Sequence, residues 1–225
     1  MTDRLSSRTL AAVAITAVSY LSAGLAHAAT ETLNIDNSHS RVGFSVRHFF
    51  TPVRGEFKNV SGTVVLDQAN LNATQVNVEI ETASINTNND RRDDDLRSAN
   101  FFEADKNPKI TFVSKSVDMK GTKGTMTGEL TMHGVTKPLT LNVEIGGFGK
   151  MGPGTVAGFT ASGTLDRKEY GITWNRTLDQ GALMLGDDVT LEISVEAKTP
   201  KPAPMAEATK PSGAPATAPA PAGGK

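Results

Sequence analysis

The sequence predicts an all-β fold of roughly eight antiparallel strands, closed into a barrel or packed as a two-sheet sandwich. Apolar and polar residues alternate in the segments 42–48, 75–81, 139–145 and 189–196. This period of two is typical of antiparallel strands with one buried and one solvated face. Turn-forming residues separate the alternating segments, and glycines recur inside them.

Four further segments complete the expected strands, at 54–67, 109–118, 123–132 and 155–165. Turns are expected at Thr51-Pro52, Lys120-Gly121, His133-Gly134 and Gly152-Pro153-Gly154. The strands are long, and internal glycines are typical of strongly coiled sheets, so both features favour a barrel. Periodicity alone does not exclude a sandwich.

The two ends of the chain differ in composition from its centre. Arg4 and Arg8 precede an apolar run that ends at Ala26-His27-Ala28, so residues 1–28 are expected to be a secretory signal peptide. An uncleaved N-terminal anchor is the alternative. Residues 199–225 are rich in Pro and Ala and predict a disordered tail. One folded domain, 29–198, is therefore expected in an exported protein, most simply in a bacterial periplasm.

Composition excludes several kinds of chemistry. The chain has no Cys, which rules out disulfides, thiolate metal sites and cysteine nucleophiles. Loss of residues 1–28 would remove Asp3, Arg4 and Arg8 and change the net charge from −1 to −2. This balance gives no indication of a nucleic-acid partner or of an anionic membrane surface.

The segment 84–112 interrupts the β pattern. Asn86 to Asn89 offers capping residues, and Asp90–Arg97 predicts a short charged helix whose end charges suit the helix dipole. Leu96 and Phe101-Phe102 are expected to hold this insertion against the barrel, over one mouth. It is either a solvated plug or a lid whose arginines meet a polar head group, and the nearby aspartates favour the self-neutralised plug.

Catalysis is an alternative that rests on few residues. His39, His48 and His133 are the histidines outside the expected signal peptide. A hydrolase needs a nucleophile, a base and an orienting carboxylate within reach of one another. No nucleophile elbow or metal-ligand spacing surrounds these histidines, so neither a catalytic residue nor a metal site is predicted.

Several runs, in order along about 33–197, resemble the YceI-like family of periplasmic lipid-binding proteins. They are Ile35-Asp36, His39-Ser40, Phe44, Val46 and His48; Gly55-Glu56-Phe57 and Gly62; Ser84-Ile85, Thr87, Arg92-Asp93, Leu96, Ser98 and Phe101-Phe102; Pro108, Ile110, Phe112 and Ser114; Gly128 to Thr131; His133 to Pro138; Asp166 to Ile172; and Asp188-Val189. The chain departs from the family at 48–53, where a smaller turn that often contains Gly is usual, and at Asp94-Asp95.

The resemblance implies an extended, eight-stranded antiparallel lipocalin-like barrel with a short helical insertion. It also implies a carrier or binding protein, not an enzyme, that holds a polyisoprenoid, an isoprenoid quinone or a similar amphiphile as ligand, without a cofactor. Ligand contacts are expected from Phe44, Val46, His48, Phe57, Val78, Ile80, Phe101, Phe102, Phe112, Leu130, Phe159 and Trp174. Arg92 and His39 are expected head-group contacts. A structural domain with a filled core stays open as an alternative, and exposed Phe49-Phe50 could serve a homodimer contact or a pore entrance.

Overall fold

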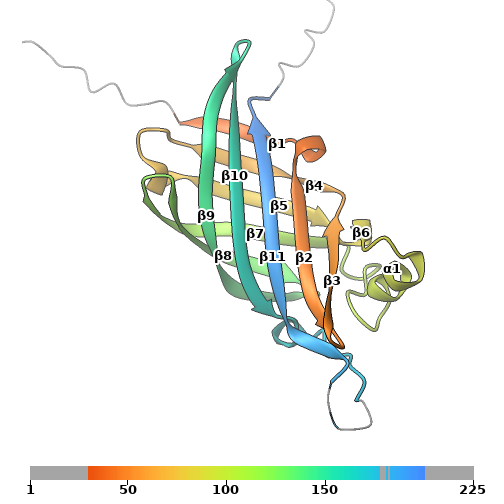
Figure 1. The fold of residues 1–225 in the computed structure, drawn as a ribbon. Coiled ribbons are helices and arrows are strands. Elements are labelled where there is room, and N and C mark those ends of the chain that lie inside the picture. Colours follow the sequence, from red (N-terminus) through yellow and green to blue (C-terminus); the bar gives the residue numbers. More distant parts are fainter. Residues whose placement is uncertain (1–29, 178–180, 182, 201–225) are drawn as a thin grey trace, which may run out of the picture.

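The computed structural model describes residues 30–177, 181 and 183–200 of the 225. The expected signal peptide and all of the expected tail beyond residue 200 lie outside these residues. The described chain is almost entirely β structure (Figure 1). Its strands are β1 Glu31–Ile35, β2 Arg41–His48, β3 Thr51–Phe57, β4 Val60–Leu66, β5 Gln75–Glu81, β6 Ile85–Asn86, β7 Lys109–Lys120, β8 Lys123–Met132, β9 Val135–Met151, β10 Gly154–Asp166 and β11 Leu185–Lys198.

The sheet closes into a barrel because β1 pairs with β4 on one side and with β11 on the other. Between them the order β4-β5-β7-β8-β9-β10-β11 is antiparallel throughout. These are eight strands, and closure leaves them no free edge. The predicted all-β, eight-stranded antiparallel barrel is confirmed, and the two-sheet sandwich is wrong.

The first three barrel strands are each broken in two. β1 and β2 are joined through the 3₁₀ turn η1 (Asn37–His39), and both pair with β11. β3 and β4 follow each other across Lys58-Asn59, and β5 and β6 are joined by η3 (Thr82–Ser84). The broken halves pair with one another, β1 with β4, β2 with β3, and β3 with β6. The three neighbouring strands therefore change direction together.

Polar contacts tie these breaks to one another. Asn37 Oδ1 accepts a hydrogen bond from Val60 N at 2.7 Å. Lys58 N donates to Ser84 O at 3.1 Å, and Asn59 N donates to Ser84 Oγ at 3.1 Å. The backbone groups that the breaks leave without a ladder partner are thus satisfied across the strands. In the sheet order β6 is terminal and β5, not β6, pairs with β7, so the barrel wall opens beside β6.

The insertion lies at this opening. The helix α1 (Asp90–Arg97) stands beside β6 at one end of the barrel (Figure 1). Asn89 caps it by accepting from Arg92 N, as the sequence predicts. Ser98 ends the helix by donating its backbone N–H to the carbonyls of Asp94 and Asp95. No helix formed by the described residues is both long and apolar enough to cross a membrane.

Two predictions about local structure are wrong. The turn expected at Thr51-Pro52 lies two residues earlier, at Phe49-Phe50, and β3 already begins at Thr51. The single strand expected at 54–67 is the broken pair β3 and β4. Neither β1 nor β6 was expected, because five and two residues are too short to give a clear period.

Candidate functional site

Two adjoining cavities occupy the inside of the barrel. The larger, about 790 Å³, lies at the end that carries the insertion, and the smaller, about 170 Å³, lies in the other part of the barrel. Both are lined by the same four residues where they meet, Phe57, Met132, Leu165 and Leu191. These four side chains, called the waist below, separate a wide compartment from a narrow one.

The smaller cavity is lined almost wholly by hydrocarbon. Apart from Thr74 and Thr160, its lining residues are aliphatic, aromatic or methionine side chains. They come from β1 to β5, from β7 to β11 and from the segment 71–74, so the whole circumference of the barrel contributes. Such a compartment suits a ligand part without hydrogen-bonding groups, because a buried polar group there would find no partner.

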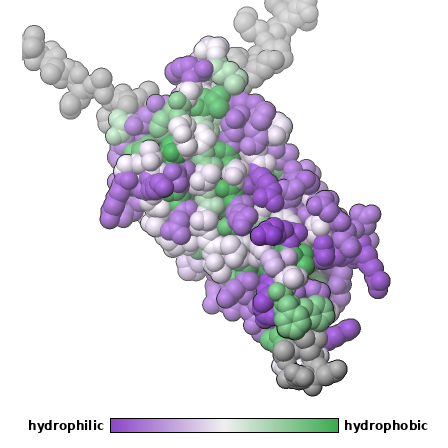
Figure 2. Space-filling view, in the orientation of Figure 1, coloured by the Kyte–Doolittle hydropathy of each residue, from purple (hydrophilic) through white to green (hydrophobic). Residues whose placement is uncertain are grey.

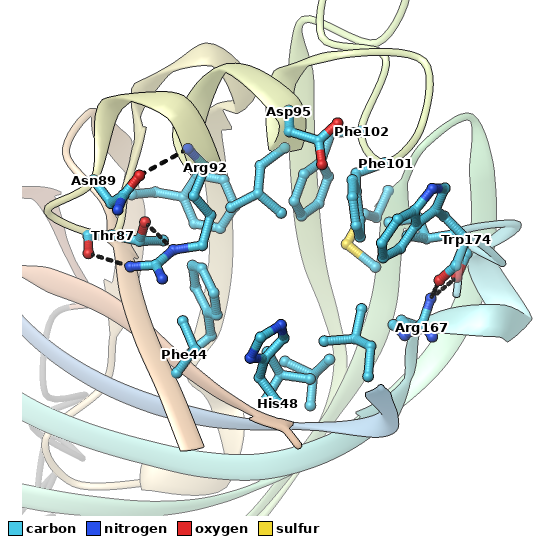
Figure 3. A pocket seen from close by; sticks show the side chains of 18 of the residues that line it. Phe44, His48, Thr87, Asn89, Arg92, Asp95, Phe101, Phe102, Arg167 and Trp174 are labelled. Atoms are coloured by element: carbon cyan, nitrogen blue, oxygen red, sulfur yellow. Dashed lines mark hydrogen bonds between the residues drawn. The ribbon is translucent and has the colours of Figure 1, made fainter. Parts of the chain in front are cut away.

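Polar side chains are gathered in the larger cavity. His48, Thr87, Asn89, Arg91, Arg92, Asp95 and Arg167 line it together with Phe44, Phe101, Phe102, Trp174 and several aliphatic residues (Figure 3). Five of the seven polar residues belong to α1 or to the segment between β6 and α1. The interior is therefore amphiphilic along its length, with polar groups at the insertion end and hydrocarbon beyond the waist.

A hydrogen-bonded chain places Arg92 at the cavity. Its Nε donates to Thr87 Oγ1 at 2.7 Å and its Nη2 donates to Thr87 O at 2.9 Å (Figure 3). The Thr87 hydroxyl in turn donates to Asp93 Oδ1 at 2.5 Å, and Thr87 N donates to the same oxygen at 2.9 Å. Asp93 is only 1% exposed. The guanidinium is thus fixed by two hydrogen bonds and linked to a buried carboxylate through a hydroxyl.

The expectation that the aspartates neutralise Arg91 and Arg92 directly is wrong. Within the described residues no carboxylate lies within 4.0 Å of a guanidinium nitrogen of Arg91 or Arg92. Asp94 pairs instead with Arg97, at 2.8 Å. Asp95 accepts from Asn100 Nδ2 at 2.7 Å and lines the cavity. Spacing along a helix did not reveal that the Arg92 side chain turns back toward Thr87.

Aromatic contacts hold the insertion in place. Phe102 meets Phe57 edge to face, with 5.8 Å between ring centroids, and Phe57 lies 5.8 Å from Phe44. Phe101 is buried and its ring centroid lies 5.2 Å from that of Trp174. The two phenylalanines therefore anchor the segment to β3 and to the chain around Trp174, in line with the predicted contact between the insertion and the barrel.

Arg167 is a buried residue at this site that was not predicted. It is 4% exposed, and it donates to the carbonyls of Gly186 (2.9 Å), Ile172 (2.7 Å) and Trp174 (2.9 Å) and to Asp187 Oδ1 (3.2 Å). Burial lowers the pKa of Arg167, and the Asp187 carboxylate opposes that shift. The residue fixes the chain segment that carries Trp174 over the cavity. The run Asp166 to Ile172 marked it only as part of a family motif.

All twelve residues expected to contact a ligand line one of the cavities. Phe44, Val46, His48, Phe57, Phe101, Phe102 and Trp174 line the larger; Phe57, Val78, Ile80, Phe112, Leu130 and Phe159 line the smaller. Their contact with a ligand stays a prediction. Sequence reasoning missed Asp95, which lies within α1, and Thr87, Leu165, Met184 and Leu185, which lie at turns and strand ends where alternation gives no signal.

His39 does not join these residues. Its side chain is 62% exposed, and it lies in η1, where it lines neither cavity. Its Nδ1 is 2.6 Å from Asp36 Oδ2, and Lys198 Nζ is 2.5 Å from the same oxygen. These contacts hold the pKa of Asp36 far below its usual range, with Lys198 the largest cause, and Asp36 raises the pKa of His39. A head group inside the barrel would not meet His39.

The three histidines occupy separate places. His48 lines the larger cavity. His133 lies at the β8–β9 turn, and its Nδ1 is 2.9 Å from Tyr170 O. His39, Asp36 and Glu196 have ligand-type atoms within 4.8 Å of one another, the one such group among the described residues. Lys198 already occupies the Asp36 carboxylate, so this group acts as an ionic link between η1 and β11.

The chain belongs to the YceI-like family: the sequence model of the YceI-like domain matches residues 33–197. A UPF0312 protein of Pectobacterium atrosepticum is 39% identical over 187 residues, which is 82% of this chain and 94% of that protein. The crystal structure of the Campylobacter jejuni YCEI protein is similar with a TM-score of 0.61 and 34% identity, covering 69% of this chain and 90% of that one. A polyisoprenoid binding domain from Saccharophagus degradans, implicated in plant cell wall breakdown, shares the fold at 15% identity, with a TM-score of 0.54 over 76% of this chain and all of that domain.

Proposed function

We propose that this protein is an exported carrier or binding protein that holds a polyisoprenoid, an isoprenoid quinone or a similar amphiphilic lipid inside its barrel. One observation carries the proposal: a wide cavity with polar groups adjoins a narrow cavity lined by hydrocarbon. A volume of about 790 Å³ is within the range of ligand pockets, and eight-stranded barrels are wide enough to hold one small ligand. The polyisoprenoid binding domain of S. degradans, which shares the fold, supports this ligand class.

The hydrocarbon tail supplies most of the affinity in this proposal. Each buried CH₂ contributes about 0.8 kcal/mol, so roughly ten such groups contribute about 8 kcal/mol before the costs of association. The tail runs from the apolar side chains of the wide cavity past the waist into the narrow cavity, where Val78, Ile80 and Phe112 are among the lining side chains. A long prenyl chain therefore needs no strong polar contact to bind.

The head group lies in the wide cavity near Arg92 and His48. Arg92 already gives two donors to Thr87, so it offers a fixed positive charge beside the ligand without rearranging. Its role is to orient the head group toward the insertion. No catalytic step is proposed, since the three histidines of the described chain lie in separate places and none of them is hydrogen-bonded to a serine or threonine hydroxyl.

Export to the periplasm is part of the proposal and rests on residues 1–28. Arg4, Arg8 and the apolar run that follows them have the composition of a secretory signal peptide. A protein that binds a membrane lipid in a water-filled compartment would carry that lipid across the aqueous space between membranes.

Mass spectrometry of organic extracts from the purified native protein tests the proposal. A prenyl lipid or quinone is expected in near-stoichiometric amount. Val189→Trp places an indole in the wide cavity and should lower the lipid content several-fold. Thr190→Trp is the matched control, because Thr190 is the exposed neighbour on the same strand. Clean extracts from several preparations, with no uptake of added prenyl lipid, would overturn the proposal and favour a structural role for the domain.

A further inference from the structure

The β2–β3 hairpin exposes two phenylalanines at the rim of the wide cavity. Phe50 is 94% exposed and Phe49 is 37% exposed. Figure 2 shows a hydrophobic patch at the lower end of the molecule, where the tip of this hairpin lies in Figure 1. The Phe49 ring meets the His48 ring edge to face at 4.5 Å, and Phe49 N donates to Met184 O at 2.7 Å. His48 and Met184 both line the cavity, so the tip is continuous with its wall.

Folding alone gives no reason for phenylalanine at this turn. His48 pairs with Thr51, which leaves Phe49 and Phe50 as a two-residue turn. Phe49 has φ 52°, a left-handed conformation that Gly or Asn adopts at less cost. The side chain of the next residue, Phe50, is exposed to water. The strained backbone of Phe49 and the exposed ring of Phe50 both oppose stability, and such combinations mark functional surfaces.

The charge of the hairpin differs from that of the whole chain. Residues 42–55 contain Arg47 and Arg54 but no Asp or Glu. Both arginines are exposed, and within the described residues neither has a carboxylate within 4.0 Å. Arg47 Nη1 donates to Phe49 O at 2.8 Å, which keeps its charge next to the tip. Although the net charge of the chain gives no indication of a membrane partner, this hairpin carries positive charge around an aromatic tip.

We propose that the β2–β3 tip docks on an anionic bilayer surface, with Phe50 inserted among the lipid head groups and Arg47 and Arg54 facing their phosphates. Aromatic side chains favour this interfacial region, and basic residues near them are attracted to anionic lipids. Docking brings the rim formed by Phe49 and His48 to the membrane, where a lipid tail can pass from the bilayer into the cavity. This purpose rests on the proposed function; the docking itself does not.

A second copy of the chain fits this surface less well than a bilayer. A stable dimer buries about 800 Å² on each partner, whereas a phenylalanine buries at most about 250 Å². The two rings at the end of the hairpin provide too little area for a stable dimer. The exposed arginines beside them would face the same arginines of the second copy and repel them. Insertion into a bilayer needs only the tip.

Vesicle flotation tests the proposal. The full chain should float with vesicles of equal parts phosphatidylglycerol and phosphatidylcholine, and less with phosphatidylcholine alone or at high salt. Phe50→Ser should weaken partition about tenfold, or about 1.4 kcal/mol, without loss of folding because the side chain is exposed. Phe148→Ser with Met151→Ser is the matched control, since these exposed apolar residues lie on the β9–β10 hairpin at the other end of the barrel (Figure 1). This control should float like the unchanged protein.

Three outcomes would overturn the proposal: an unchanged protein that does not float, an equal loss in the β9–β10 control, or flotation unaffected by Phe50→Ser. If Phe50→Ser instead converts a dimer to a monomer in light scattering and leaves flotation unchanged, the tip is a self-association contact. Flotation is measured with no prenyl ligand added. Clean organic extracts would therefore overturn the proposed function while leaving a positive flotation result intact.

Discussion

Replacing Arg167 with Met should strongly destabilise the fold. The side chain is almost fully buried and gives four hydrogen bonds, three of them to backbone carbonyls. Met keeps much of the volume of the stem but leaves the carbonyls of Gly186, Ile172 and Trp174 without a donor. Hydrogen bonds to charged groups contribute about 1.5–3 kcal/mol each, but they share one side chain and do not add. Each buried carbonyl left without a donor costs about 1–3 kcal/mol, so the expected loss is about 3–5 kcal/mol in total.

Urea unfolding followed by circular dichroism measures this loss. The chain has one tryptophan, Trp174, so its fluorescence reports directly on the segment that Arg167 holds. Lys168→Met is the matched control, because Lys168 contacts the same Asp187 at 2.8 Å from a more exposed position. That surface pair should contribute less than about 1 kcal/mol. The reasoning is refuted if Arg167→Met costs no more than Lys168→Met.

Three further predictions concern affinity, packing and pH. Arg92→Ala should leave the prenyl-lipid content of extracts largely unchanged, because tail burial dominates affinity; complete loss of lipid would contradict this. Phe101→Ala should lower the free energy of unfolding by about 3–5 kcal/mol, whereas Val113→Ala, at an exposed position, should change it by less than about 0.5 kcal/mol; equal effects in urea would argue against the anchor. Since Asp36 raises the folded-state pKa of His39, the stabilisation from this contact is complete below the unfolded value of 6.5 and is lost as pH rises through the folded value. The melting temperature should therefore fall as the pH rises above 6.5 by an amount that is absent in His39→Gln, and an identical fall in both proteins would rule the contact out as its cause.

Local periodicity was sufficient for much of the fold. Strands such as β5 and β8 follow from alternation, because the two faces of a strand meet different surroundings. The helix α1 and its cap at Asn89 follow from residues a few positions apart. Phe101 and Phe102 were predicted as anchors because large apolar residues beside a charged helix must bury somewhere. Each of these features depends on neighbours in the sequence.

The breaks in the first three strands could not be predicted in this way. They depend on Asn37, which accepts a hydrogen bond from Val60 N, and on Ser84, which accepts from the backbone N–H groups of Lys58 and Asn59. These contacts join segments that are far apart in the sequence. Asn37 and Ser84 each look like an ordinary polar residue in their own segment. The opening beside β6 that the insertion occupies results from these contacts.

The sequence by itself determined that the chain forms antiparallel strands with an apolar inner face, interrupted by one capped helix. Only the tertiary structure decided that the inner face encloses two cavities, that Arg92 and Arg167 lie at the wider one, and that His39 lies at neither. The physical reason is that alternation fixes which side chains point inward. The space left between them depends on how the barrel closes and where its strands bend, and those are set by pairings such as β1 with β11 between opposite ends of the chain.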